Sequence, residues 1–353
     1  MKRDVVSGGE YFRRHVFFCI FTQNQQLNIR ENKMKIVYMG TPDFAVETLD
    51  ALLKAGHDIV GVVTMPDKPA GRGRQLRPSA VKEYAVAHGL KVMQPEKLKD
   101  PTFVSELRSL EADIQVVVAF RMLPEVVWAM PRLGTVNVHA SLLPNYRGAA
   151  PINWAVMNGE KETGVSTFLL KHDIDTGDII MQESVQITDE DNAGTVHDKL
   201  MHLGAELAVR TIEALGNGSA TFHRQDDIDP ATLKAAPKIF KEDMLICWQR
   251  STKEVINHIR GLAPYPAAWT TLTDAKGQEV TAKIFCARPT ERAVIDGLSL
   301  EPGRVSSDGK GRLSIGTGDG AIDVLEIQLS GKTRMKVTDL LHGFHPLEGS
   351  ICH

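Results

Sequence analysis

The sequence contains few cysteines, and they lie far apart. Cys19, Cys247, Cys286 and Cys352 form neither a CxxC pair nor a spacing typical of a metal site. Scattered cysteines of this kind are typical of free thiols in a reducing compartment rather than of a disulfide framework. We therefore expect a cytoplasmic protein that holds no structural metal.

Long apolar runs are also missing. No stretch reaches the roughly 20 apolar residues that are needed to cross a bilayer. The short run from His15 to Phe21 follows two arginines, but no small-residue cleavage site comes after it. Residues 1–33 show no periodicity, and a clear strand begins directly after Met34. We expect residues 1–33 to be an unstructured extension, Met34 to be the natural start, and no membrane partner.

A strong excess of charge of either sign is absent as well. The net charge is −3 at pH 7, which by itself points to no polyanionic partner. Five basic residues nevertheless gather between residues 67 and 82: Lys68, Arg72, Arg74, Arg77 and Lys82. Glycines and prolines in residues 65–78 predict an exposed loop without regular structure. Such a loop either binds a phosphate backbone or is only exposed to solvent, and composition alone favours the second interpretation.

The periodicity of the chain predicts two folded parts. In residues 34–216, apolar strands alternate with amphipathic helices, which is typical of an α/β fold with a parallel sheet. The turn at Gly40 is not GxGxxG, so a dinucleotide-binding fingerprint is absent. Residues 217–241 are polar and are interpreted as a linker. Residues 242–353 contain short strands between Gly/Asp turns, which predicts a small β-barrel, with residues 316–320 as a hairpin turn.

Hydrophobic periodicity predicts the positions of the strands and helices. Strands are expected at residues 35–39, 58–64, 90–93, 113–119, 135–139, 164–170, 178–184, 268–273, 279–287, 303–306, 312–315 and 321–329. Helices are expected at residues 46–55, 79–88, 124–130, 193–215 and 252–262.

One polar stretch has the groups needed for chemistry on a carbonyl. Asn137 and His139 are two residues apart at the end of an expected strand, so their side chains share a face. Asp173, Asp175 and Asp178 follow in a tight loop. An amide and an imidazole can stabilise the oxyanion that forms when an amine attacks a carbonyl group. A carboxylate can orient the imidazole or accept the proton of the amine.

Each of these residues also has a simpler, purely structural interpretation. A histidine on a strand is more often a core or surface residue than a catalyst, but Asn137 on the same face makes the two interpretations equally plausible. Asp173 is compatible with a local turn and Asp178 with a cap, so the residues alone select no single aspartate. The sequence shows neither a nucleophile elbow nor zinc-ligand spacing. Direct transfer to a bound amine is therefore favoured over a covalent or metal mechanism.

The stretch NVHASLLPNYRGAAPI at residues 137–152 resembles the signature of the folate-dependent formyltransferases. Residues 39–45, 66–73 and 162–165 are in register with the branch of that family that acts on methionyl-tRNA, and the similarity covers about residues 34–345. The resemblance implies a Rossmann-like catalytic domain followed by an OB-like barrel that binds tRNA. It implies transfer of formyl from 10-formyltetrahydrofolate to the amine of initiator methionyl-tRNA, for translation initiation. We expect a monomer.

The resemblance also implies roles for particular residues. It makes Asn137, His139 and Asp175 catalytic, and it thereby selects one of the three aspartates. The residues implied to line the tetrahydrofolate site are Ser141, Leu142, Leu143, Pro144, Phe120, Arg121 and Met122. Residues 119–124 are one residue shorter than the usual pattern beside the folate, and we expect Arg121 to reach the pterin or a carboxylate.

For the basic loop, the resemblance implies insertion at the acceptor end of the tRNA, where Arg72 would read the weak first base pair. Two other interpretations are weaker. A formyltransferase that acts on a sugar-nucleotide amine would use the same three catalytic residues, but it would need neither the basic loop nor the barrel. An RNA-binding protein with a vestigial catalytic domain would have no reason to keep all three catalytic residues intact.

Overall fold

The computed structural model describes residues 33–70, 75–225, 230–273, 277–290, 294–295, 298–342 and 350–353. The prediction for the extension before Lys33, and those for Arg72 and Arg74, lie outside the described residues. The contacts of the chain divide it into two compact units. The first unit contains the chain up to Val138 together with residues 205–222, and the second contains residues 139–204 and 223–353.

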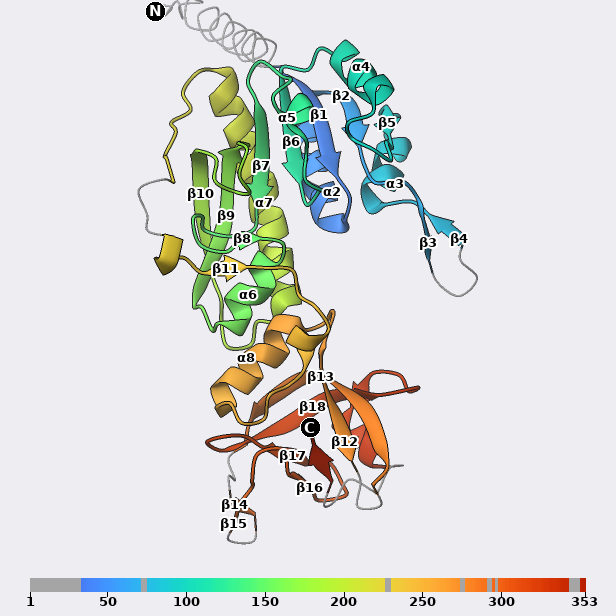
Figure 1. Ribbon diagram of the computed structural model, residues 1–353, viewed down its shortest axis with the longest axis vertical. Coiled ribbons are helices and arrows are strands. Elements are labelled where there is room, and N and C mark those ends of the chain that lie inside the picture. The colour runs from blue at the N-terminus through green and yellow to red at the C-terminus, as the bar shows by residue number, and fades with distance from the viewer. Residues whose placement is uncertain are drawn as a thin grey trace, which may run out of the picture. The chain divides into compact units, whose positions relative to one another are not determined.

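The first unit contains a parallel sheet with the strand order β7-β6-β1-β2-β5 (Figure 1). These strands are β1 (Lys35–Gly40), β2 (Asp58–Val63), β5 (Val92–Met93), β6 (Ile114–Val118) and β7 (Thr135–His139). All neighbouring pairs in this order run parallel. Every residue of β6 is buried, as expected for a strand that is covered on both faces. The prediction of an α/β fold with a parallel sheet is confirmed.

Helices follow the strands of the first unit. They are α2 (Asp43–Lys54), α3 (Ala80–Ala87), α4 (Pro101–Ser109), α5 (Glu125–Trp128) and the later part of α7 (Ala193–Gly216). Helix α2 begins three residues earlier than expected, with Asp43 in its first turn. Helix α4 was not expected, although its signals are present. The Asp100 side chain accepts hydrogen bonds from two backbone N–H groups, and Pro101 occupies the first helical position.

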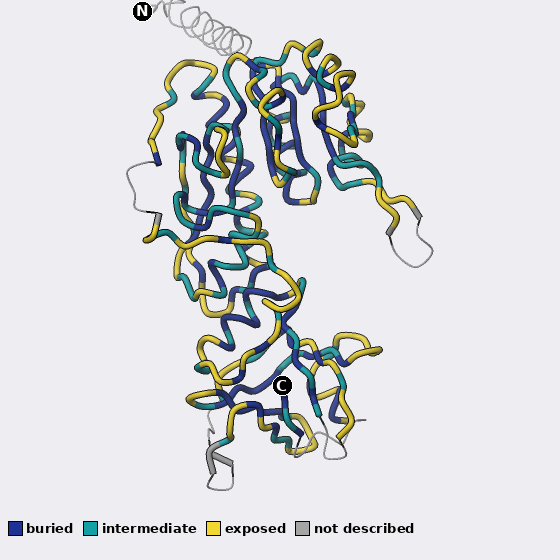
Figure 2. The backbone as a smooth tube through the Cα atoms, in the orientation of Figure 1, coloured by how far each residue is buried: buried dark blue, intermediate teal, exposed yellow. Residues whose placement is uncertain are grey.

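The basic segment forms a hairpin, so the prediction of a loop without regular structure is wrong. Strands β3 (Lys68–Ala70) and β4 (Gln75–Arg77) pair antiparallel, with Lys68 opposite Arg77. Much of this hairpin is exposed (Figure 2). Proline is tolerated in it because both strands of an isolated pair are edge strands, so the missing N–H of Pro69 disrupts no further ladder.

The second unit begins with elements that follow β7 in the chain. Strands β9 (Glu162–Leu169) and β10 (Ile179–Gln186) form an antiparallel pair. Helix α6 (Pro151–Met157) lies before them and packs against α8 (Thr252–Leu262). Two short strands, β8 (Arg147–Gly148) and β11 (Ala235–Ala236), pair in parallel. Part of the segment that was interpreted as a linker is therefore bound to the second unit.

The rest of the second unit is a nearly closed antiparallel β-barrel, as predicted. Its strands are β12 (Ala268–Thr273), β13 (Glu279–Pro289), β16 (Val305–Ser307), β17 (Leu313–Gly316), β18 (Ala321–Leu329) and β20 (Ile351–Cys352). The strand order is β16-β17-β18-β13-β12-β20, and a bridge between Arg304 and Ile351 brings the two ends of this order together. The interior contains buried residues such as Trp248, Leu272 and Leu313. The hairpin turn at residues 316–320 is confirmed.

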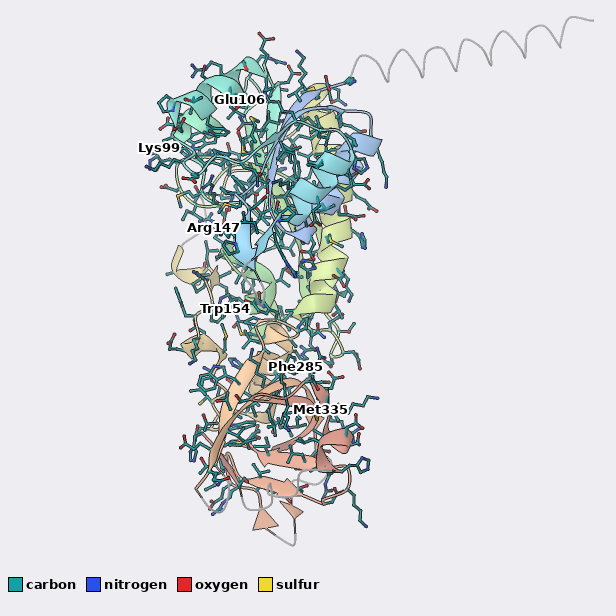
Figure 3. The ribbon with its side chains drawn as sticks, turned by 90° about the vertical axis from the view of Figure 1, so that its right-hand side faces the viewer. Lys99, Glu106, Arg147, Trp154, Phe285 and Met335 are labelled. Atoms are coloured by element: carbon teal, nitrogen blue, oxygen red, sulfur yellow. The ribbon has the colours of Figure 1, made fainter. Side chains whose placement is uncertain are left out.

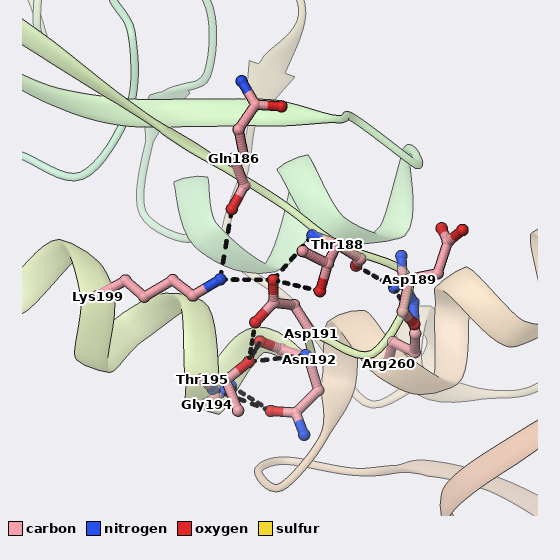
Figure 4. A network of polar contacts seen from close by, with 9 residues as sticks. All are labelled: Gln186, Thr188, Asp189, Asp191, Asn192, Gly194, Thr195, Lys199 and Arg260. Atoms are coloured by element: carbon pink, nitrogen blue, oxygen red, sulfur yellow. Dashed lines mark hydrogen bonds and ion pairs between the residues drawn. The ribbon is translucent and has the colours of Figure 1, made fainter.

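A polar network fixes the turn between β10 and α7 (Figure 4). The carboxylate of Asp191 accepts hydrogen bonds from the backbone and hydroxyl of Thr188, from the Thr195 hydroxyl and, at 2.6 Å, from Lys199 Nζ. Burial opposes ionisation of Asp191, but these donors outweigh it and lower the pKa of Asp191 to about 2. Arg260 of α8 donates to the carbonyl groups of Thr188 and Asp189, which attaches the barrel's helix to this turn.

Candidate active site

The end of β7 positions two of the expected catalytic side chains. The apolar residues Val136 and Val138 are buried, and Asn137 between them is half-buried. His139 is the last residue of the strand and is only 7% exposed. Because side chains alternate along a strand, Asn137 and His139 lie on one face, two residues apart.

His139 has a different oxygen atom near each ring nitrogen. Its Nε2 lies 2.9 Å from the carbonyl oxygen of Tyr146, and a carbonyl oxygen only accepts, so Nε2 carries a proton. Its Nδ1 lies 3.9 Å from Oδ2 of Asp175, which is too long for a hydrogen bond. The proton that His139 gains when it becomes charged is therefore on Nδ1 and faces the Asp175 carboxylate.

Of the three aspartates in the following loop, the structure brings Asp175 to His139. The Asp173 side chain is 82% exposed, and Asp178 forms an ion pair with Lys171 at 2.7 Å. Asp175 has a left-handed backbone conformation with φ of 54°, and its Oδ2 accepts a hydrogen bond from the N–H of Gly148 at 3.0 Å. Of the three aspartates, Asp175 is therefore the one whose carboxylate lies beside His139.

The loop from Asn145 to Ala149 supplies partners to both side chains, which no motif in the sequence had indicated. Tyr146 provides the carbonyl oxygen beside His139, and Gly148 provides the N–H beside Asp175. A Cβ atom on Gly148 would lie 2.4 Å from the carbonyl oxygen of Ala236, and the φ of Gly148 is +125°, so glycine is required there. Buried Gln225 bonds to Arg147 and to the Asp175 loop. Pairing between residues so distant in the sequence leaves no periodic signal.

The residues expected to line the folate site fall into two groups. Ser141 is fully buried, and its hydroxyl donates to the Asn145 carbonyl at 2.8 Å. Leu143 is buried with Phe168, whereas Leu142 and Pro144 are half-buried. Ser141 and Leu143 therefore brace the loop after β7 from inside.

The other group, Phe120, Arg121 and Met122, lies in the first unit between β6 and α5. Met122 is 73% exposed. The guanidinium of Arg121 donates to the carbonyl oxygens of Pro95 and Glu96, and burial lowers the pKa of Arg121. Its terminal nitrogens are thus engaged within the first unit rather than extended toward a ligand.

The basic residues of the hairpin also differ among themselves. Lys82 forms an ion pair with Asp67 at 2.6 Å, and Gln94 donates to the same carboxylate, so this trio fixes the base of the hairpin. Lys68 and Arg77 are exposed and opposite one another on β3 and β4. The described part of the chain therefore presents two hairpin cations to solvent and uses a third internally.

Two family models match the chain. The first, described as "Formyl transferase", matches residues 34–212, and the second, "Formyl transferase, C-terminal domain", matches residues 238–345. The chain belongs to the formyl transferase family. The resemblance found in the sequence is confirmed, and the chain is a one-carbon transferase with an α/β domain and a barrel domain of this family.

Curated relatives of this formyl transferase extend over nearly its whole length. A methionyl-tRNA formyltransferase of Bacteroides fragilis is 53% identical over 321 residues, which is 91% of this chain and 98% of the relative. A methionyl-tRNA formyltransferase of Pelotomaculum thermopropionicum is 46% identical over 319 residues, covering 90% of this chain and 98% of the relative.

Solved structures share the fold of this formyl transferase at lower identity. HypX from Aquifex aeolicus in complex with tetrahydrofolic acid has a TM-score of 0.59 and 18% identity, over 88% of this chain and 47% of HypX. An N-formyltransferase from Helicobacter canadensis, in complex with folinic acid and dTDP-3-aminofucose, has a TM-score of 0.59 and 20% identity, over 82% of this chain and 98% of that protein.

Among the described residues, no group of three or more His, Cys, Asp or Glu side chains is arranged to hold a metal ion. No helix within the same residues has the length and apolar character needed to cross a membrane.

Proposed function

We propose that this formyl transferase transfers the formyl group of 10-formyltetrahydrofolate to the free amino group of initiator methionyl-tRNA, for translation initiation. The observation that carries the proposal is the buried pair of His139 and Asp175, in which Nδ1 faces a carboxylate oxygen at 3.9 Å. Support for this acceptor comes from relatives named methionyl-tRNA formyltransferase, which align over about nine-tenths of the chain.

In the proposed reaction, the lone pair of the methionyl amine attacks the formyl carbon and forms a new C–N bond. The electrons of the C=O double bond move to oxygen, which becomes an oxyanion in a tetrahedral intermediate. The Asn137 amide donates a hydrogen bond to this oxygen, and the positive charge of protonated His139 stabilises it electrostatically. Loss of one such donor typically lowers the rate about 10²–10³-fold.

Asp175 has two tasks in the proposal. Its carboxylate stabilises the charge on His139 through Nδ1, and it accepts the proton that the amine loses, directly or through a water molecule. The tetrahedral intermediate then collapses: the C=O double bond re-forms, the bond to the folate nitrogen breaks, and that nitrogen takes the proton that Asp175 accepted from the amine. A free α-amine has a pKa of about 7.7, so only modest help from a base is needed.

The residues present fit a folate co-substrate. Within the first unit, Met122 is exposed and Phe120 half-buried, and within the second unit, Leu142 and Pro144 are half-buried; apolar side chains of this kind suit a flat pterin ring. When bound, the donor supplies the formyl carbon that the amine attacks. We assign Ser141, Leu143 and Arg121 to the support of these segments, because their polar or apolar groups are already engaged inside the protein.

For the tRNA we propose a contact surface made of Lys68, Arg72, Arg74 and Arg77, together with Lys82 at the start of α3, whose ion pair with Asp67 holds it beside the hairpin. We also propose the domain limits 34–216 for catalysis, 217–241 for the connection and 242–353 for the RNA-binding barrel. A tRNA substrate favours a cytoplasmic location. Monomeric behaviour is supported by the exposed large apolar side chains, which come from separate elements rather than from one strand or helix.

The deciding assay follows labelled formyl from 10-formyltetrahydrofolate to charged initiator tRNA and, in parallel, to a UDP-amino sugar. We expect product on the tRNA. Product on the sugar alone would contradict the proposal in favour of a sugar-nucleotide formyltransferase. Absence of both products would favour an RNA-binding protein without catalysis.

The hairpin is tested by the double variant Lys68→Ala/Arg77→Ala. Each cation that contacts a phosphate releases about one counterion, so the slope of log affinity against log salt is expected to fall by about 1–2. We expect the KM for tRNA to rise about tenfold, since the salt slope implies losses of this order at moderate salt. Folate binding should stay unchanged, and an unchanged salt slope would remove the hairpin from the tRNA contact.

A further inference from the structure

The chain between the two family matches reaches into the candidate active site. Neither family model matches residues 213–237. We call residues 223–237 the connector. The connector, which is itself part of the second unit, pairs with Ile179 at His223. At Gln225 and at residues 234–237, it contacts the loops that hold His139 and Asp175.

The side chain of Gln225 is bonded at each of its polar atoms. Its Nε2 donates to the carbonyl oxygens of Asp175 at 3.1 Å and of Gly177 at 2.6 Å. Its Oε1 accepts two hydrogen bonds from Arg147, at 2.8 and 3.2 Å. Arginine only donates, so this contact fixes the amide orientation and directs both N–H groups to the Asp175 loop. Gln225 is 4% exposed, so water cannot replace these bonds freely.

The second contact holds the loop on the other side of the catalytic pair. The N–H of Ala149 donates to the Ala236 carbonyl at 2.8 Å, and β8 pairs with β11. The indole of Trp154 donates to the Pro237 carbonyl at 2.8 Å; Trp154 and Arg147 are labelled in Figure 3. The connector thus braces the segment whose Gly148 N–H binds the Asp175 carboxylate.

Asp175 needs such support because of its backbone. A left-handed conformation at a residue other than glycine is strained and persists where the surroundings impose it. Gln225 binds the peptide carbonyl of Asp175 itself and that of Gly177, two residues later. These two bonds fix the main chain from which the carboxylate projects toward His139.

We propose that Gln225 of the connector is a positioning residue, which holds the Asp175 loop so that the carboxylate faces Nδ1 of His139. The inference rests on the proposed role of Asp175 as the carboxylate of the reaction. Gln225 itself touches the backbone beside Asp175 rather than any reacting group, so it acts through Asp175.

The first test is Gln225→Met, which keeps the length of the side chain and removes all its hydrogen bonds. We expect kcat to fall about 100-fold, as a misplacement on the order of 1 Å does, while the KM for tRNA changes less than about twofold. Gln328→Met is the matched control, because Gln328 also donates to a carbonyl, that of Lys332, but lies in the barrel. The control should retain the kcat of the unmodified chain.

A double-mutant cycle with Asp175→Asn separates positioning from general loss of structure. If Gln225 acts through Asp175, the double variant should be no slower than Asp175→Asn alone, to within about twofold. An equal loss from Gln225→Met in both backgrounds would overturn the inference, and so would an unchanged kcat in Gln225→Met.

Two further experiments apply if Gln225→Met does not fold or if the acceptor is not tRNA. If Gln225→Met does not fold, Gln225→Glu replaces it, because Glu keeps the acceptor for Arg147 and removes both donors to the loop. If the unmodified chain formylates a sugar amine instead of tRNA, the proposed acceptor fails, and the same cycle run on the sugar still judges Gln225. If the unmodified chain transfers no formyl at all, both proposals fall.

Discussion

Asp175 and Asp191 both lie in loops of the second unit, and their side chains are 12% and 8% exposed. Their carboxylates are nevertheless used very differently. Asp191 accepts hydrogen bonds from Thr188, Thr195 and Lys199, with an ammonium group at 2.6 Å. Among the described residues, the carboxylate of Asp175 has one backbone donor, Gly148, and a histidine nitrogen at 3.9 Å.

The number of hydrogen-bond donors around a carboxylate indicates whether it is suited to a structural or to a chemical role. A carboxylate that is saturated with donors has a low pKa and little capacity to accept another proton, so Asp191 is suited to hold a turn. Asp175 keeps lone pairs available beside an imidazole, in a backbone conformation that has to be maintained by its neighbours. The spare capacity of Asp175, rather than burial alone, is what suits it to the role that we propose for it.

The largest effect is expected from Asp175→Asn. The amide keeps the shape of the side chain but can neither stabilise charged His139 nor accept the proton of the amine. We expect kcat for formyl transfer to fall about 10²–10⁴-fold, the usual contribution of a general base, with tRNA affinity unchanged. Steady-state kinetics and a binding titration measure the two quantities. A large loss of tRNA binding would contradict the assigned role.

Asp191→Asn should act on stability instead. A folded pKa of about 2, against an unfolded value near 3.8, corresponds to about 2 kcal/mol of stability at neutral pH. Because the folded pKa is lowered, this stability is present above pH 4 and is lost as pH falls toward 2. The variant should lose about 2 kcal/mol of unfolding free energy at pH 7 and show a flatter acid limb in denaturant titrations.

The kcat of Asp191→Asn tests whether Asp191 takes part in the reaction. Asp191 lies in the turn before α7 and has no contact with His139 or Asp175, so kcat should remain within about twofold of the unmodified value. A kcat loss as large as that of Asp175→Asn would show that the two carboxylates are not separable in the way their surroundings indicate.

The smallest effect is expected from Lys161→Ala, close to the Asp191 turn. Lys161 pairs with Asp189 at 2.5 Å, but the two side chains are 60% and 80% exposed. Water and salt screen such a pair, and exposed pairs of this kind often contribute nothing measurable. Thermal unfolding should show no change in Tm, and kcat should be unaltered. A clear drop in Tm would mean that exposure is a poor guide to which ion pairs matter here.

The sequence predicted the regular parts of the fold well, because hydrophobic periodicity is a local signal. Strand β7 was expected at residues 135–139, and β12 and β18 were expected at residues 268–273 and 321–329, all with the observed bounds. Helix α4 was missed even though Asp100 and Pro101 form an ordinary helix start, because its apolar residues are few.

The candidate site was predictable only in part. Asn137 and His139 could be paired from strand alternation, since two residues on one strand need no tertiary information. The choice of Asp175 among three aspartates required either the resemblance or the fold, because its distance from His139 is set across 36 residues. The two-residue pair of β8 and β11 joins residues almost 90 positions apart, and Gln225 lies in a polar segment without periodicity. No local pattern could have indicated either.

The connector has a practical consequence for anyone who divides this chain or exchanges its barrel with that of a relative. A cut after residue 212, where the first family match ends, would leave Gln225 and Ala236 on the wrong fragment. The first fragment would keep Asn137, His139 and Asp175 but lose the hydrogen bonds that Gln225 and Ala236 make to the nearby loops. A fusion point after Pro237 would instead keep all of these contacts on one fragment. It would include the last of them, the hydrogen bond from the Trp154 indole to the Pro237 carbonyl.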